Sequence, residues 1–252
     1  MGRAIFGLLL GFTIVFAVAY WSRTCLPDPN DKGIEWLRRE DVIVVQMKTV
    51  EPASDSLRQR LAVPEFTLYG AGTLLFTDPG RPDSKLVFQA AVSDSTTRSI
   101  LKELEDIGFS DLGYAESSAG TVDGAATYIY AKTLLGANAI VLRDSDANSG
   151  DEEKLTSIRS HLLSIAEDHL QRAQDYNIES ILQVSRKEGA EGLEEQVHTG
   201  DDAERLSEIF TIGKGTGYVT IPEGGDGKLV EGGYRPILPY EENFPEFDPP
   251  TQ

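Results

Sequence analysis

The chain has 252 residues, of which 40% are hydrophobic and 25% are charged, and its formal net charge is −18 at pH 7. This composition is that of a globular protein that can bury a core. The excess of acidic residues excludes a surface that binds nucleic-acid phosphates through Lys and Arg. The single cysteine, Cys25, excludes an intrachain disulfide and a cysteine-rich zinc site, and three histidines leave little material for a histidine metal centre.

The amino terminus is hydrophobic from Ala4 to Trp21, and Thr13 is its one clearly polar residue. A stretch of this length suits a short transmembrane helix or the core of a signal peptide. Ala17-Val18-Ala19 offers a cleavage site, whereas the aromatic and basic residues that follow are typical of the interfacial end of a retained span. We predict a transmembrane anchor or signal segment over residues 1–24 and favour the anchor. Secretion after cleavage near Ala19 is the alternative.

Residues 25–40 are expected to form a linker that leads into a single α+β domain over residues 41–240. The first part of this domain shows short β-branched and apolar runs typical of strands, at 42–47, 66–69, 73–76 and 85–92. Glycines at 70–72 predict a hairpin turn between the second and third of these strands.

An amphipathic helix is predicted over residues 94–107, where apolar residues recur at intervals of three and four. Ser93 or Ser95 can cap its first turn, and Gly108 suits the left-handed position after its last turn. The longest helix is predicted from Glu152 to Ala173, and its apolar stripe should lie on the sheet.

Two further strands are predicted between these helices, at Ala126–Leu135 and Ala139–Leu142, around a turn at 136–138. After the long helix, residues 181–184 predict another strand.

Beyond this strand the pattern weakens. Residues 186–208 are charged with room for one short helix, and residues 213–233 are rich in glycine and lack a clear period. Residues 241–252 read as a disordered acidic tail. We therefore predict an α+β fold: a mostly antiparallel sheet of about five to seven strands with two main helices on one face, preceded by an N-terminal hydrophobic helix.

Several motifs follow one another in a fixed order. Residues 64–73 read P-E-F-T-L-Y-G-A-G-T, residues 108–112 read G-F-S-D-L, residues 121–127 read T-V-D-G-A-A-T, and residues 235–241 read R-P-I-L-P-Y-E. In these motifs the chain resembles a group of uncharacterised exported bacterial proteins, although Ala71 stands where that group often has Asp. The resemblance implies export and a hairpin–helix–hairpin fold, and it carries no established activity and no catalytic residue.

Two arguments about the side of the membrane disagree. Counting Arg3 before the hydrophobic stretch against the basic residues after it would place the domain in the cytoplasm. The signal-like amino terminus and the resemblance to exported proteins favour the opposite side. We expect a single-pass membrane protein with an extracytoplasmic domain.

The best candidate for a metal site is a run of alternating oxygen-bearing side chains, Asp144, Asp146 and Asn148, which resembles the start of a calcium-binding EF-hand loop. The remainder of that motif is missing, because Gly150 comes one position late and Leu155 stands where a bidentate acid is needed. The alternative is a polar turn whose acidic residues lie favourably at the start of the next helix. Calcium is therefore a candidate cofactor, and no other cofactor is expected.

Other motifs have simpler explanations. His161 and Asp168 share a face of the long helix, yet a half-buried structural histidine is far commoner than a metal ligand. Ser99 and Lys102 match S-x-x-K, but the partner motifs of penicillin-interacting enzymes are absent. The glycine-rich segments 213–217 and 224–228 lack the residues and the strand–helix context of a phosphate-binding loop.

The sequence therefore favours a non-enzymatic protein over an enzyme. We expect a membrane-tethered extracytoplasmic interaction module, or an accessory subunit of a membrane or cell-envelope complex, with protein partners and no nucleic acid. The alternative is an envelope hydrolase, or a protein that binds calcium or a small ligand, whose site is not recognised. A deep pocket that gathers His161, Asp168 or the acidic residues of 144–153 would favour this alternative.

Overall fold

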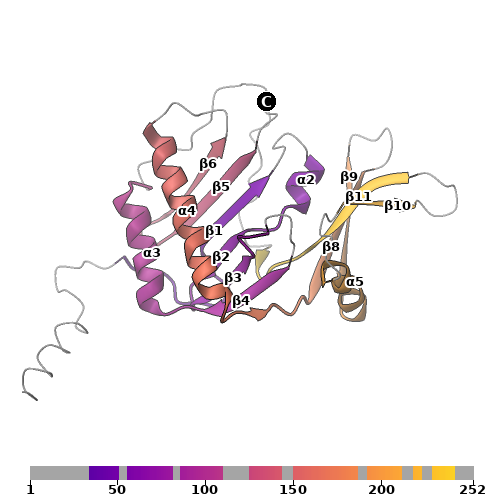
Figure 1. Cartoon of the computed structure of the whole chain (residues 1–252), viewed down its shortest axis with the longest axis horizontal. Helices are drawn as coiled ribbons and strands as arrows, with labels where there is room; N and C mark the ends of the chain where they lie inside the picture. Colours follow the sequence, from indigo (N-terminus) through magenta and orange to yellow (C-terminus); the bar gives the residue numbers. More distant parts are fainter. Residues whose placement is uncertain are drawn as a thin grey trace, which may run out of the picture. The chain divides into compact units, whose positions relative to one another are not determined.

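The structure, a computed structural model, describes residues 34–50, 56–81, 86–109, 125–143, 150–186, 192–211, 218–222 and 229–241. These residues form an α+β fold with two antiparallel sheets (Figure 1). The hydrophobic helix expected near the amino terminus lies outside the described residues. Within the described part of the chain, no helix is both long and apolar enough to cross a bilayer.

The larger sheet has seven strands in the order β6-β5-β1-β2-β3-β4-β7. The predicted α+β class and antiparallel sheet of five to seven strands are thus confirmed. The strands comprise β1 Ile43–Val50, β2 Phe66–Tyr69, β3 Thr73–Thr77, β4 Val87–Ala91, β5 Ala126–Lys132, β6 Ala137–Arg143 and β7 Gln174–Asp175.

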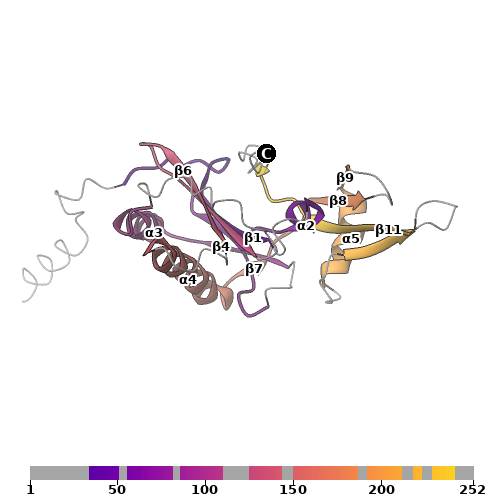
Figure 2. The ribbon, with the colours of Figure 1, turned by 90° about the horizontal axis from the view of Figure 1, so that it is seen from above.

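One face of this sheet is covered by two helices, α3 (Asp94–Asp106) and α4 (Gly150–Leu170), as the view from above shows (Figure 2). Alternate residues of the central strands point toward these helices and form the main core. Its most buried members are Val44, Val45, Met47, Phe66, Leu68, Leu74, Phe76, Ile100, Ile129, Ile140, Ile158 and Leu162. The helix stripes read from the sequence therefore lie on the sheet as expected.

The ends of α3 follow the sequence prediction closely. The Ser93 hydroxyl accepts a hydrogen bond from the Thr96 amide at 3.2 Å, which satisfies a free donor of the first turn. Gly108 has a φ of +81°, and the Phe109 amide bonds back to the Leu104 carbonyl at 2.9 Å. The side chain of Phe109 is buried against the main core, so the cap also fixes how the chain leaves the helix.

The first described residues pack on the larger sheet at the end of the β2–β3 hairpin. Trp36 is buried, and its indole N–H donates to the Gly70 carbonyl at 3.0 Å. A Cβ on Gly70 would lie 1.8 Å from the Leu37 carbonyl oxygen, and one on Gly72, whose φ is +87°, would lie 2.5 Å from that of Val92. The two glycines of the P-x-F-T-L-Y-G-x-G-T motif thus have a structural reason, which is the close approach of neighbouring backbone.

The opposite face of the larger sheet is covered in part by the residues that follow the last strand. Leu238 is buried there with Tyr69, Leu75 and Tyr130. The Tyr69 hydroxyl donates to the Pro239 carbonyl at 2.8 Å. The R-P-x-L-P-x-E motif therefore includes a segment that closes this face.

The second sheet has four strands in the order β10-β11-β8-β9. Only β8 was predicted as a strand. The elements are β8 Ser180–Arg186, β9 Leu193–Thr199, β10 Tyr218–Pro222 and β11 Leu229–Pro236, with the helices α2 Ser56–Leu61 and α5 Asp201–Thr211 packed against this sheet. Leu57 and Leu61 of α2 form a small core with Leu182 and Val184 of β8, and this core attaches α2 to the four-stranded sheet.

The turn between β5 and β6 differs from the prediction. It spans Thr133–Gly136, where the Thr133 amide donates to the Gly136 carbonyl at 2.8 Å, instead of residues 136–138. Leu134 and Leu135, which were assigned to a strand because they are apolar, occupy the turn itself.

Candidate functional site: an apolar cavity beside the β5–β6 turn

A cavity of about 440 Å³ lies between the second half of α3 and the turn that joins β5 to β6. Its walls are mostly apolar and come from three parts of the chain, with Ile34, Leu101, Leu104, Phe109, Ala131 and Leu135 as the main contributors. This volume falls in the range of small-molecule and side-chain binding pockets. The cavity can therefore accept an apolar group.

The polar groups at the cavity are mostly engaged within the protein. The Asn138 side chain donates to the Phe109 carbonyl at 2.6 Å and accepts from the Ala139 amide. The Thr133 hydroxyl accepts from the Leu135 amide at 3.2 Å. Glu105 is exposed on α3, and none of the hydrogen bonds or ion pairs of the described residues involves its carboxylate. The cavity thus combines apolar walls with one available negative charge.

The turn beside the cavity presents two leucines to solvent. Leu134 is 51% exposed and Leu135 is 96% exposed, although turn positions of this kind usually carry polar residues or glycine. The Leu134 amide donates to the Glu35 carbonyl at 2.8 Å, which holds the turn against the first described residues. Sequence reasoning missed this surface. The flanking Thr133 and Gly136, both common in turns, were the signal that could have identified it.

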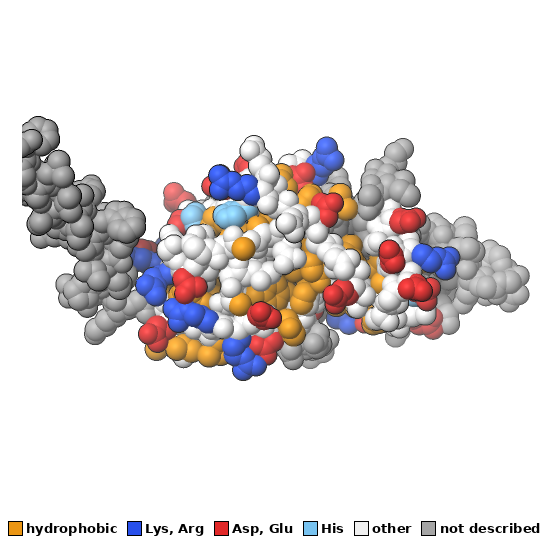
Figure 3. All heavy atoms as spheres, turned by 90° about the horizontal axis from the view of Figure 1, so that it is seen from below, with side chains coloured by type: hydrophobic (Ala, Val, Ile, Leu, Met, Phe, Trp, Pro, Cys, Tyr) orange, Lys and Arg blue, Asp and Glu red, His pale blue; other side chains and the backbone are white. Residues whose placement is uncertain are grey.

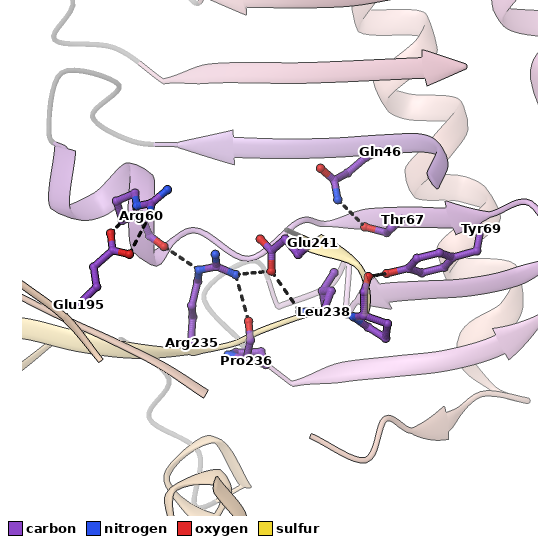
Figure 4. Close-up of polar contacts among 10 residues, drawn as sticks. Gln46, Arg60, Thr67, Tyr69, Glu195, Arg235, Pro236, Leu238 and Glu241 are labelled. Atoms are coloured by element: carbon purple, nitrogen blue, oxygen red, sulfur yellow. Dashed lines mark hydrogen bonds and ion pairs between the residues drawn. The ribbon is translucent and has the colours of Figure 1, made fainter. Parts of the chain in front are cut away.

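A second cluster of charged side chains joins β9 and β11 of the four-stranded sheet to α2 and to the segment that follows β11 (Figure 4). The Arg235 guanidinium, on β11, donates to the Arg60 carbonyl at 2.6 Å and to the Glu241 carboxylate at 2.8 Å. The same carboxylate accepts from the Leu238 amide, and Arg60 forms a two-bond pair with Glu195 of β9. Because the side chains of Arg235 and Glu241 are only 9% and 17% exposed, this motif has a structural role.

Lys48 lies beside this charged cluster on β1. Burial is the main cause that lowers the pKa of its amine to about 8, and the charges of Arg235 and Arg60 act in the same direction. Glu241 acts in the opposite direction. A lysine with a lowered pKa can act as a nucleophile or base, but Lys48 does not line the cavity.

Glu65, which directly precedes β2, is affected by the charge of Arg159 on α4, and one buried polar atom of each side chain has no hydrogen-bond partner among the described residues. Burial raises the pKa of the Glu65 carboxyl, while the Arg159 charge and a hydrogen bond from Thr49 oppose this shift. Neither residue lines the cavity.

The residues singled out in the sequence do not meet in one site. Asp144, Asp146 and Asn148 lie outside the described residues, so the calcium site stays a prediction. His161 lies 2.8 Å from the Glu103 carboxylate on α3, while Asp168 is exposed, and neither lines the cavity. Within the described ranges, no three His, Cys, Asp or Glu side chains are grouped so that they could hold a metal ion.

The face of the molecule seen from below carries charges of both signs (Figure 3). From below, acidic and basic side chains alternate with hydrophobic ones that reach the surface between them (Figure 3). No protein-family model matches this chain, and no curated protein or solved structure is significantly similar to it.

Proposed function

We propose that this chain is a membrane-tethered, extracytoplasmic interaction module or an accessory subunit of a membrane or cell-envelope complex. The observation that carries the proposal is the apolar cavity with its exposed leucine turn, next to Ile34 and Glu35 in the second half of the predicted linker. The hydrophobic stretch from Ala4 to Trp21 supports the membrane tether. A domain held at a membrane with an apolar docking surface is suited to binding another protein there.

The chemistry of the cavity indicates the kind of partner. Its apolar walls would bury a leucine-sized or phenylalanine-sized side chain, which is the usual anchor of a protein interface. The Glu105 carboxylate and the net charge of −18 favour a partner with Lys or Arg beside that anchor. We therefore expect a partner segment that presents an apolar residue flanked by basic ones.

A small apolar ligand is the second candidate for the same cavity, because its volume would also suit such a molecule. This version corresponds to the ligand-binding alternative from the sequence. It predicts that blocking the cavity leaves protein partners unaffected.

Two glycines offer a matched pair of variants to test the proposal. Gly136 lines the cavity, whereas Gly192 lies beside β9 in the other sheet, and a Cβ at either position meets no atom within 4 Å. The full-length tagged protein, Gly136→Trp and Gly192→Trp would each be purified from gently solubilised membranes of the native host. Co-purifying proteins would then be identified and quantified.

We expect a stoichiometric partner with the unaltered protein and with Gly192→Trp, and at least a tenfold loss of it with Gly136→Trp, about 1.4 kcal/mol of binding free energy. Equal recovery with both variants would exclude the cavity as the docking site. An isolated protein in several detergents would contradict the accessory-subunit function itself.

A further inference from the structure

The β5–β6 turn holds Leu134 and Leu135 in a fixed, outward position. Three hydrogen bonds order it: from the Thr133 amide to the Gly136 carbonyl, from the Leu135 amide to the Thr133 hydroxyl, and from the Leu134 amide to the Glu35 carbonyl. Two neighbouring leucines that are 51% and 96% exposed on an ordered turn lose the benefit of burial. A surface of this kind indicates an apolar environment that covers it.

The course of the chain indicates which environment this is. The first described residues run beside the β5–β6 turn in both views of the ribbon (Figures 1 and 2), and the bond between Leu134 and Glu35 joins them directly. Residues 22–33 separate this point from the end of the hydrophobic stretch. Twelve residues span at most about 40 Å when fully extended. The turn is therefore covalently restricted to the neighbourhood of any bilayer that holds residues 4–21.

We propose that the Leu134–Leu135 turn inserts into the lipid interface of the membrane that anchors the chain, and that this second contact orients the domain. The inference rests on the tether of the proposed function and adds lipid as a second binding partner. The contact is apolar in nature, because Glu35 and Glu105 lie near the turn and the net charge of −18 disfavours anionic lipids.

The tether makes so small a contact sufficient. Two leucine side chains alone would hold a free protein on a bilayer only weakly. A short linker makes the contact intramolecular, with an effective concentration in the millimolar range. Once the anchor is in the membrane, insertion of the turn needs only a small favourable free energy. In this arrangement the cavity, which Leu135 borders, faces the region next to the bilayer where the segments of a membrane partner emerge.

The test uses the full chain reconstituted in zwitterionic phosphatidylcholine vesicles. In a Cys25→Ser background, an environment-sensitive fluorophore is attached at Leu135→Cys or, as control, at Val197→Cys on β9, which is 57% exposed. Vesicle flotation measures the tether, and lipids with a spin-labelled quencher in the interface measure contact. We expect emission from position 135 to shift to shorter wavelength and to be quenched by these lipids, while position 197 keeps the emission of a water-exposed site.

The other possible outcomes test the lipid contact and the tether separately. If the protein floats with the vesicles but position 135 behaves like position 197, the lipid contact is excluded and the tether stands. If the protein fails to float, the tether is excluded, and the proposed function and the lipid contact fail together. A further variant, Leu134→Ser in the labelled protein, should reduce the quenching at position 135, and unchanged quenching would exclude insertion of the turn as a unit.

Discussion

The seven-stranded and the four-stranded sheet are both antiparallel, yet they are encoded in different ways. The central strands β2 and β3 are buried almost throughout, because α3 and α4 cover one face and the segment around Leu238 contributes to the other. In contrast, β9 exposes most of its side chains and carries Glu194 and Glu195. The comparison shows that a strand is easier to predict from sequence when both of its faces are buried, because nearly all of its residues are then apolar.

The prediction with the largest expected effect tests how much the core of the seven-stranded sheet contributes to the free energy of unfolding. Phe76 is fully buried in β3 and its ring packs 5.9 Å from that of Phe88. Phe76→Ala should lower the free energy of unfolding by about 3–5 kcal/mol, since it removes the aromatic ring and leaves a cavity. The matched change in the other sheet, Val197→Ala at an exposed position, should alter it by less than about 0.5 kcal/mol. Urea denaturation followed by circular dichroism measures both, and similar losses would contradict the proposed difference.

The sequence was sufficient wherever local chemistry and burial agreed. Ser93, Gly108 and the apolar stripe of α3 predicted that helix and both its ends. The same reasoning is wrong at Leu134 and Leu135, because apolar residues predict a strand there and the predicted turn begins three positions late. It also missed β10 and β11. The run Tyr218–Pro222 of β10 is short and lies between glycine-rich segments, and β11 itself contains two glycines, so neither strand gives a clear hydrophobic period.

The candidate site was harder to predict for a physical reason. The walls of the cavity come from residues distant in sequence, such as Ile34, Leu104 and Ala131, and each of them alone reads as an ordinary core residue. Their common location follows from the docking of α3 beside β5, which depends on the tertiary fold. The calcium candidates had the opposite character, since their spacing was visible in sequence but their placement is not described.

The second prediction concerns the cluster around Arg235, which joins the four-stranded sheet to α2 and to the segment that follows β11. Arg235→Met removes the ion pair with Glu241 and the hydrogen bond to the Arg60 carbonyl, and it leaves a largely buried carboxylate without its partner. We expect a loss of about 2–3 kcal/mol. The control, Arg60→Gln, breaks the more exposed pair with Glu195 and should cost at most about 1 kcal/mol.

The shape of the unfolding curve then shows whether the two sheets unfold together or separately. If the four-stranded sheet depends on this cluster, Arg235→Met should produce a second, earlier transition while Arg60→Gln keeps a single one. Equal effects of the two variants would show that the buried ion pair has no special role.

The smallest expected effect is a pH dependence that originates from Lys48. Its pKa is about 8 in the folded protein against about 10.5 when unfolded. Between these values the unfolded chain binds more protons, so this group makes the folded state more stable as the pH rises through the interval. Below pH 8 the cost of burying the charged amine is fully present. Lys48→Met should therefore stabilise the protein at pH 7, because it removes the cost of burying the charged amine.

The stabilisation by Lys48→Met should shrink as the pH approaches 10. This dependence distinguishes it from a gain of apolar packing, because improved packing would persist at every pH.

The measurement must stop near pH 10. Burial raises the pKa of Tyr130, and burial is the main cause that raises the pKa of Tyr176 to about 12. Above pH 10 the unfolded state therefore loses tyrosine protons that the folded state keeps. The free energy of unfolding then falls for a reason unrelated to Lys48. Lys102→Met, on the exposed side of α3, is the control and should leave the curve of stability against pH unchanged. A constant difference between Lys48→Met and the unaltered protein from pH 7 to 10 would show that the amine of Lys48 is not buried in the folded protein.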